Sequence, residues 1–151
     1  MHLKIPPLIL AGVLAAVMWV LSWLFPQFVL AFAAKNMLAA FLVLAGLLIC
    51  GLGLLSFYRA MTTVNPRNPN AATSLVSKGI YRFSRNPMYL GFVLILVGWG
   101  VYLAHILALL LVPAVYVVYM NRFQIAPEEQ ALHRVFGDEF VLYKSRVRKW
   151  L

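Results

Sequence analysis

The chain has 151 residues, of which 64% are hydrophobic and 11% charged, and its formal net charge is +9. This length fits a single domain over residues 1–151, and the charged fraction excludes an ordinary soluble protein, because soluble domains carry about 25% charged residues. In so hydrophobic a chain, the excess of positive charge indicates anionic lipid as a partner and argues against nucleic acid.

Three long segments without a charged side chain predict where the chain crosses a lipid bilayer, since about 20 apolar residues span its core. They cover residues 5–34, 36–58 and 86–121. The first two predict one helix each, over about 8–25 and 37–58. Three glycines in the second helix are expected to let a neighbouring helix approach closely: Gly46, Gly51 and Gly53.

The third uncharged segment is too long for one span. A single helix over it would be about 50 Å long at 1.5 Å per residue, whereas the bilayer core is about 30 Å thick. Two shorter helices joined by a turn, over about 87–104 and 106–121, fit better. The predicted fold class is therefore an all-α membrane protein with four transmembrane helices, a cytoplasmic loop and a cytoplasmic tail over 122–151.

The distribution of basic residues predicts the orientation. With four spans, all 13 lysines and arginines except Lys35 lie on one side, as the positive-inside rule requires of the cytoplasmic face. With three spans, the basic tail would have to lie on the opposite side. We therefore expect a multi-pass protein of the plasma or inner membrane with both termini cytoplasmic. A cleaved signal peptide is a weaker interpretation of the first span, because its apolar run is too long.

The tail is expected to form an amphipathic helix that begins at Pro127, a residue suited to the first helical position. Gly137 is expected to break this helix. Its apolar residues recur every three or four positions and form one face: Leu132, Phe136, Phe140, Tyr143, Val147 and Trp150.

Four acidic residues, all in the tail, have two interpretations: Glu128, Glu129, Asp138 and Glu139. They can be solvated residues that favour the start of a helix. Alternatively, a carboxylate at the point where the last span leaves the membrane can bind hydroxyl groups or a cationic ligand. The segment 79–89 is equally ambiguous, since Asn86 followed by Pro87 is also a common helix start.

Taken together and in this order, several motifs resemble the isoprenylcysteine carboxyl methyltransferase family, which is related to membrane phospholipid N-methyltransferases. The resemblance covers about residues 62–149. The motifs are Leu75-Val76-Ser77-Lys78-Gly79-Ile80-Tyr81, Arg85-Asn86-Pro87-Met88-Tyr89, Glu128-Glu129, and Phe136-Gly137-Asp138-Glu139-Phe140 with Tyr143.

This resemblance implies an S-adenosylmethionine-dependent methyltransferase that acts on a lipophilic acceptor at the cytoplasmic membrane face. Arg85 and Glu128 are the expected catalytic residues, with Arg85 pairing with the carboxylate of the cofactor. The residues expected to bind the cofactor are Thr73, Ser74, Leu75, Val76, Tyr81, Asn86, Pro87, Met88, Tyr89 and Glu128. No metal is expected, because the three histidines are dispersed along the chain.

The sequence departs from the family pattern at one position expected to bind the cofactor and at one position expected to bind the acceptor. Asn86 stands where the family usually has a histidine. Gln124 matches an arginine that meets the substrate carboxylate in the prenylcysteine enzymes, and Arg122 is a nearby substitute. Gln124 and Arg122 are the two residues assigned to substrate binding. The acceptor can therefore be a carboxylate, a lipid amine such as that of a phospholipid, or a small thiol.

A transporter and a non-enzymatic four-helix membrane protein are the alternatives from other classes. A transporter is expected to carry an ionisable residue inside a span, and only His105, at a predicted turn, approaches this. A purely structural protein does not require the paired motifs of the two cytoplasmic segments.

Overall fold

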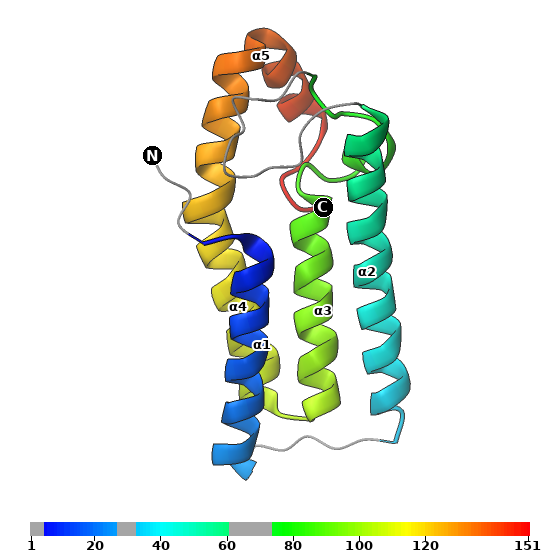
Figure 1. Ribbon diagram of the computed structural model, residues 1–151, viewed down its shortest axis with the longest axis vertical. Helices are drawn as coiled ribbons and strands as arrows, with labels where there is room; N and C mark the ends of the chain where they lie inside the picture. Colours follow the sequence, from blue (N-terminus) through cyan, green and yellow to red (C-terminus); the bar gives the residue numbers. More distant parts are fainter. Residues whose placement is uncertain (1–4, 27–32, 61–73) are drawn as a thin grey trace.

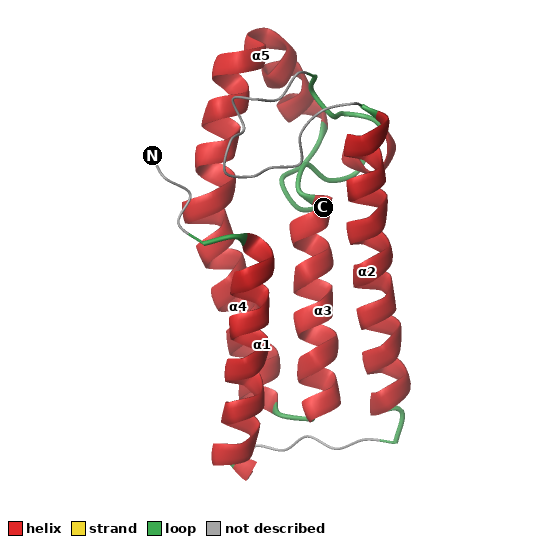
Figure 2. Cartoon of the chain, viewed as in Figure 1, coloured by secondary structure: helices red, strands yellow, loops and turns green. Residues whose placement is uncertain are grey.

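Residues 5–26, 33–60 and 74–151 are described by a computed structural model (Figure 1). Within these ranges every element is a helix (Figure 2). The helices are α1 (Pro7–Leu24), α2 (Lys35–Arg59), α3 (Pro87–Leu103), α4 (Ile106–Tyr119) and α5 (Ala126–Arg146), with a short 3-10 helix η3 (Gly79–Arg82) and a π-helical segment η4 (Met120–Ile125). The four helices expected from the sequence are thus confirmed, with ends that differ by no more than two residues.

Three helical stretches are long and apolar enough to cross a membrane by length and composition: Pro7–Leu24, Lys35–Arg59 and the continuous stretch Ile106–Arg146. The apolar helix α3 is shorter, at 17 residues. The all-α class and the multiple apolar helices agree with the expected fold. The number of spans and the position of the termini relative to a membrane stay predictions.

Helix α3 lies at the centre of the bundle, and its most extensive contact is with α2 (Figure 1). Small residues make this contact close, because a Cβ atom at Gly46 would lie 2.6 Å from the carbonyl oxygen of Gly91. Gly53 likewise leaves room for the side chain of Met88. The expectation for Gly51 was wrong: a Cβ there would meet nothing within 4 Å, because this glycine points away from the bundle.

The turn between α3 and α4 places His105 in a structural role. Its Nδ1 accepts a hydrogen bond from the backbone N–H of Ala108 (3.2 Å) and thereby caps α4. Its Nε2 then carries the proton and donates to the carbonyl oxygen of Phe25 (2.9 Å), just after α1. His105 is 1% exposed, so it joins α1 to the α3–α4 turn.

The tail helix continues directly from α4 through η4 and then breaks at Gly137, whose φ of 50° and ψ of −123° are not helical. This break was expected, and it lets the chain turn back toward the bundle. After α5 the last residues return to the start of α3 (Figure 1). Phe140 of the expected apolar face is buried, and Leu132, Phe136 and Tyr143 are half-buried. Helix α5 ends at Arg146, however, so Val147 and Trp150, which were expected on the same helix face, lie in the segment that follows the helix.

Candidate functional site

The starts of α3 and α5 lie toward the end of the bundle opposite the start of α2 (Figure 1), and polar side chains from both regions are hydrogen-bonded to one another there. Three segments distant in the sequence meet there: residues 81–89, residues 121–129 and the returning residues 143–150. Helix α5 lies beyond the segments expected to span the membrane, so the two adjacent glutamates of its first turn occupy the boundary between the bundle and the tail.

Glu128 is held from two sides. Its Oε1 accepts a hydrogen bond from the hydroxyl of Tyr89 on α3 (2.6 Å) and another from the side-chain amide of Gln124 (2.6 Å). Gln124 is 1% exposed and Tyr89 is 9% exposed, so the carboxylate contacts buried donors. Gln124 lies in the π-helical segment, a widened turn that is often found at functional sites.

Burial of Glu128 disfavours its charged form and raises the pKa of this carboxyl to about 7. The hydrogen bonds from Tyr89 and Gln124 act in the opposite direction, since they stabilise the carboxylate, but they do not cancel the effect of burial. A group with this pKa changes between neutral and charged forms near physiological pH, which is typical of functional sites.

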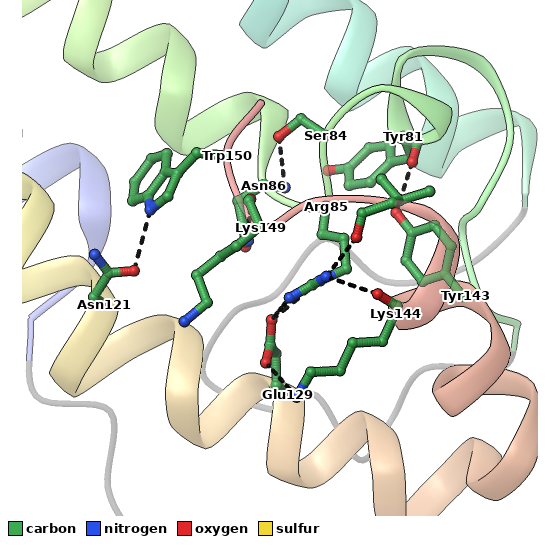
Figure 3. A network of polar contacts seen from close by, with 11 residues as sticks. Tyr81, Ser84, Arg85, Asn86, Asn121, Glu129, Tyr143, Lys144, Lys149 and Trp150 are labelled. Carbon is green, nitrogen blue, oxygen red and sulfur yellow. Dashed lines mark hydrogen bonds and ion pairs between the residues drawn. The ribbon is translucent and has the colours of Figure 1, made fainter.

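Glu129 turns to a different set of partners (Figure 3). Its Oε1 accepts hydrogen bonds from Nη2 (2.8 Å) and Nε (3.2 Å) of Arg85, and its Oε2 lies 3.3 Å from Nζ of Lys144. Burial favours the neutral acid, but the hydrogen bonds and charges of Arg85 and Lys144 outweigh it, so the pKa of Glu129 is lowered. Glu129 is therefore a structural anion at neutral pH.

Arg85 also fastens the returning C-terminal segment. Its Nη1 donates to the carbonyl oxygens of Lys144 (3.2 Å) and Val147, and its backbone N–H donates to the carbonyl oxygen of Arg148 (3.0 Å). The side chain of Arg85 is 9% exposed. All these contacts join the start of α3 to the tail, and they account for the buried guanidinium without any ligand.

Asn86 takes part in the same fastening. It occupies the N-cap position of α3, but its side chain does not cap that helix. Instead its Nδ2 donates to the carbonyl oxygen of Lys149 (2.9 Å). Further along, the indole N–H of Trp150 donates to Oδ1 of Asn121 (3.1 Å), which ties the segment to η4 (Figure 3). The amide that replaces the family's histidine thus holds a backbone carbonyl.

The remaining residues predicted for the cofactor lie along the approach to α3. Thr73 lies outside the described residues. Ser74 donates a hydrogen bond to the carbonyl oxygen of Ala60 (3.0 Å). Tyr81 is buried, with its ring edge-on to Phe57 and its carbonyl oxygen accepting from the hydroxyl of Tyr143 (2.7 Å). The others are buried or half-buried: Leu75, Val76, Pro87 and Met88. Their assignment to a cofactor stays a prediction.

The two residues predicted to bind the acceptor are separated. Gln124 points inward to Glu128, whereas Arg122 is exposed and its guanidinium lies over the ring of Phe123. Arg122 therefore does not take the place that Gln124 occupies. Neither the contact between Trp150 and Asn121 nor the pairing of Glu129 with Arg85 could be predicted from the sequence, because neither pair has a recognisable spacing.

Comparison with known proteins identifies the family to which the chain belongs. The profile of the phospholipid methyltransferase family matches residues 34–139. A curated Haemophilus influenzae protein described as uncharacterized is 47% identical over 64 residues, which make up 42% of this chain and 100% of that protein. No solved structure matches the chain. The chain belongs to the phospholipid methyltransferase family, which groups with the isoprenylcysteine-type membrane methyltransferases.

Proposed function

We propose that this member of the phospholipid methyltransferase family transfers a methyl group from S-adenosylmethionine to a lipophilic acceptor in the membrane. The observation that carries the proposal is the half-buried carboxylate of Glu128, which the buried side chains of Tyr89 and Gln124 hold at the end of an apolar helix bundle. Family membership supports the use of this cofactor and of a lipid acceptor. The proposed setting is a four-span protein with both termini cytoplasmic.

The side chains around Glu128 fit the cofactor chemically. S-adenosylmethionine carries an ammonium group and ribose hydroxyls, and the carboxylate of Glu128 is suited to either of them. Its hydrogen bonds from Tyr89 and Gln124 both go to Oε1. The faces of Tyr81 and Tyr89 offer electron-rich rings, which attract a sulfonium cation.

When bound, S-adenosylmethionine supplies an electrophilic methyl group whose leaving group needs no proton. The chain therefore has to align donor and acceptor and to exclude water, which can contribute several kcal/mol to the rate enhancement, up to about 7–11 in well-oriented cases. Tyr89 and Gln124 orient the carboxylate of Glu128. The ion pair of Arg85 with Glu129 fastens the tail against the start of α3.

This geometry favours a positioning role for Arg85 instead of contact with the cofactor. Its guanidinium already contacts Glu129 and two carbonyl oxygens. Asn86, bound to the carbonyl oxygen of Lys149, is assigned the same role. Glu128 is then the residue of the proposed site whose carboxyl group titrates near neutral pH.

The acceptor proposed here carries an amine or another neutral polar group. The amide of Gln124 is engaged by Glu128 and supplies no positive charge. An acceptor carboxylate would therefore lie beside a buried acid without a cationic partner, which is unfavourable by several kcal/mol. A lipid amine fits the family description. A small lipophilic thiol is the alternative.

The test is the binding of S-adenosylhomocysteine to the protein in detergent, measured as a rise in melting temperature, because a ligand of the folded state stabilises it. We expect the parent protein and Asp138→Ala to respond and Glu128→Ala to lose the response. Asp138 is an exposed acid of the same helix. No shift in the parent at millimolar ligand would overturn the proposed function. Equal loss in both variants would remove Glu128 from the site.

A further inference from the structure

Helix α4 buries a hydroxyl group that has no hydrogen-bond partner. Tyr116 is 0% exposed. Among the buried side-chain nitrogen and oxygen atoms of the described residues, its hydroxyl oxygen is the one without a partner. A buried polar group left unpaired loses its hydration without compensation, and phenylalanine would fill the same space without this cost. The hydroxyl therefore requires a partner that the described residues do not provide.

The position of Tyr116 connects it to the site around Glu128. Tyr116 belongs to the same buried cluster as Tyr89 and Leu96 of α3 and Met120 of η4. The hydroxyl of Tyr89 donates a hydrogen bond to Glu128, whereas the hydroxyl of Tyr116 in the same cluster has no partner among the described residues. The π-helical segment begins four residues after Tyr116, at Met120.

The hydroxyl of the half-buried Tyr143, near this end of the bundle, is also satisfied from within the chain. Tyr143 donates to the carbonyl oxygen of Tyr81 (2.7 Å). Tyr116 differs from both Tyr89 and Tyr143 in this respect, although it is more completely buried than Tyr89. Buried polar groups in native structures are nearly always paired with a protein group or with ordered water, so the unpaired hydroxyl of Tyr116 requires an explanation.

We propose that the hydroxyl of Tyr116 is the hydrogen-bonding partner of the methyl acceptor's polar group, which enters between α3 and α4 on the end of a long apolar chain. This inference rests on the proposed function and extends it to a substrate-binding residue. It also specifies the acceptor as a group that carries an N–H or O–H. The apolar side chains around Tyr116 suit the adjoining hydrocarbon of the acceptor.

The direction of the hydrogen bond matters for the reaction. The phenol oxygen of Tyr116 accepts from the acceptor's N–H, so the nitrogen lone pair stays free. That lone pair forms the new N–CH3 bond while the carbon–sulfur bond breaks and its electron pair stays on sulfur. The new ammonium then releases its proton to the carboxylate of Glu128 or to water. A donor that occupied the lone pair would prevent this attack.

The test uses two probes that differ only in the polar group: para-dodecylaniline, whose amine is uncharged at neutral pH, and dodecylbenzene. Binding to the protein in a nonionic detergent is measured by the shift in melting temperature, with and without S-adenosylhomocysteine. The variant is Tyr116→Phe, and the matched control is Tyr119→Phe, a half-buried tyrosine of the same helix. Activity is not needed for this readout.

We expect the parent and Tyr119→Phe to bind para-dodecylaniline about fivefold more tightly than Tyr116→Phe does, the factor that one neutral hydrogen bond supplies. Dodecylbenzene should bind all three proteins equally. Without probes, Tyr116→Phe should melt at the same temperature as the parent or higher, because it loses an unpaired hydroxyl. It should also keep its response to S-adenosylhomocysteine.

Two results would overturn the inference. Equal binding of para-dodecylaniline by parent and Tyr116→Phe would show that the hydroxyl does not meet the polar group. A lower melting temperature of the unliganded Tyr116→Phe would show that the hydroxyl has a structural partner. The two proposals can fail separately. If para-dodecylaniline binding depends on Tyr116 but S-adenosylhomocysteine does not bind, the binding position is supported and methyl transfer is refuted.

Discussion

Glu128 and Glu129 are neighbours in the sequence, yet their carboxylates bind opposite kinds of partner. Glu128 accepts from the neutral donors Tyr89 and Gln124, whereas Glu129 pairs with the cation Arg85. Their pKa values consequently move in opposite directions, upward for Glu128 and downward for Glu129. Glu128 therefore supplies the site with a group that titrates near neutral pH, whereas Glu129 binds Arg85 and thereby holds the tail against the start of α3.

The ion pair predicts a stability effect. Glu129→Gln should lower the free energy of unfolding by about 2 kcal/mol, because it leaves the guanidinium of Arg85 without its anionic partner in a site where both side chains are largely buried. Denaturant titration in mixed micelles measures this. The control, Glu139→Gln, changes an exposed acid of the same helix. Equal effects of the two substitutions would contradict a structural role for the pair.

The raised pKa of Glu128 predicts a pH dependence of stability. The pKa is about 7 in the folded protein, whereas that of an unperturbed glutamate is 4.5, so the folded state binds this proton more tightly than the unfolded state. The contribution is fully present below about pH 4.5 and is lost as the pH rises to about 7. Over this window the parent should lose up to about 3 kcal/mol relative to Glu128→Gln. Parallel stability profiles of the two proteins would disprove the shift.

The same titration predicts a pH dependence of ligand binding. If the ionised form of Glu128 binds the ammonium group of S-adenosylhomocysteine, affinity should rise as the pH increases toward about 7 and then level off, by up to about tenfold per pH unit below the pKa. Isothermal titration at several pH values measures this. Glu128→Gln should show a flat profile. A parent profile as flat as that of the variant would exclude the ionised carboxylate from the site.

Helix packing predicts different effects for two glycines of α2. Gly46→Ala should destabilise the protein by about 1–3 kcal/mol, because its Cβ would overlap the backbone of α3 at Gly91. Gly51→Ala should be neutral or slightly stabilising, since nothing lies within 4 Å of the added methyl. Melting temperatures of the two variants in detergent check this. A larger loss for Gly51→Ala would show that its outward face is buried in a contact outside this chain.

Topology is tested with single cysteines in a Cys50→Ser background. Leu151→Cys and Ala34→Cys lie at exposed positions toward opposite ends of the bundle. In intact cells, a membrane-impermeant thiol reagent should label Ala34→Cys, and it should label Leu151→Cys only after permeabilisation, because all basic residues except Lys35 are expected on the cytoplasmic side. Labelling of Leu151→Cys in intact cells would contradict four spans.

Gln124 predicts the preference among acceptors. A panel assay with labelled cofactor should show weak or absent methylation of a prenylcysteine acid and faster methylation of lipid amines or lipophilic thiols. An amide cannot replace the bidentate pairing of a guanidinium with a carboxylate. Gln124→Arg should shift the preference toward the acid, whereas Gln130→Arg, at an exposed position of α5, should not. A parent that methylates the prenylcysteine acid fastest would refute the argument from Gln124.

The helices and the break at Gly137 can be predicted from the sequence alone. The reason is local: a helix in lipid needs an uninterrupted apolar run, and Gly137 can adopt the positive φ at which the tail helix breaks. The segments 8–25, 37–58, 87–104 and 106–121 therefore closely match α1 to α4. Motif order likewise indicated the family before any geometry was known.

The face of each helix that meets a neighbour and the partner of each polar group depend on tertiary contacts, which the sequence does not reveal. A helix that is apolar on all sides carries no periodic signal for its orientation, so Gly46 and Gly51 look alike in the sequence although only Gly46 packs against α3. For the same reason, the sequence does not reveal that the hydroxyl of Tyr116 is buried without a partner among the described residues. Arg85 pairs with Glu129 while Glu128 stays with Tyr89, because the chain turns back at Gly137 and brings its tail to the start of α3.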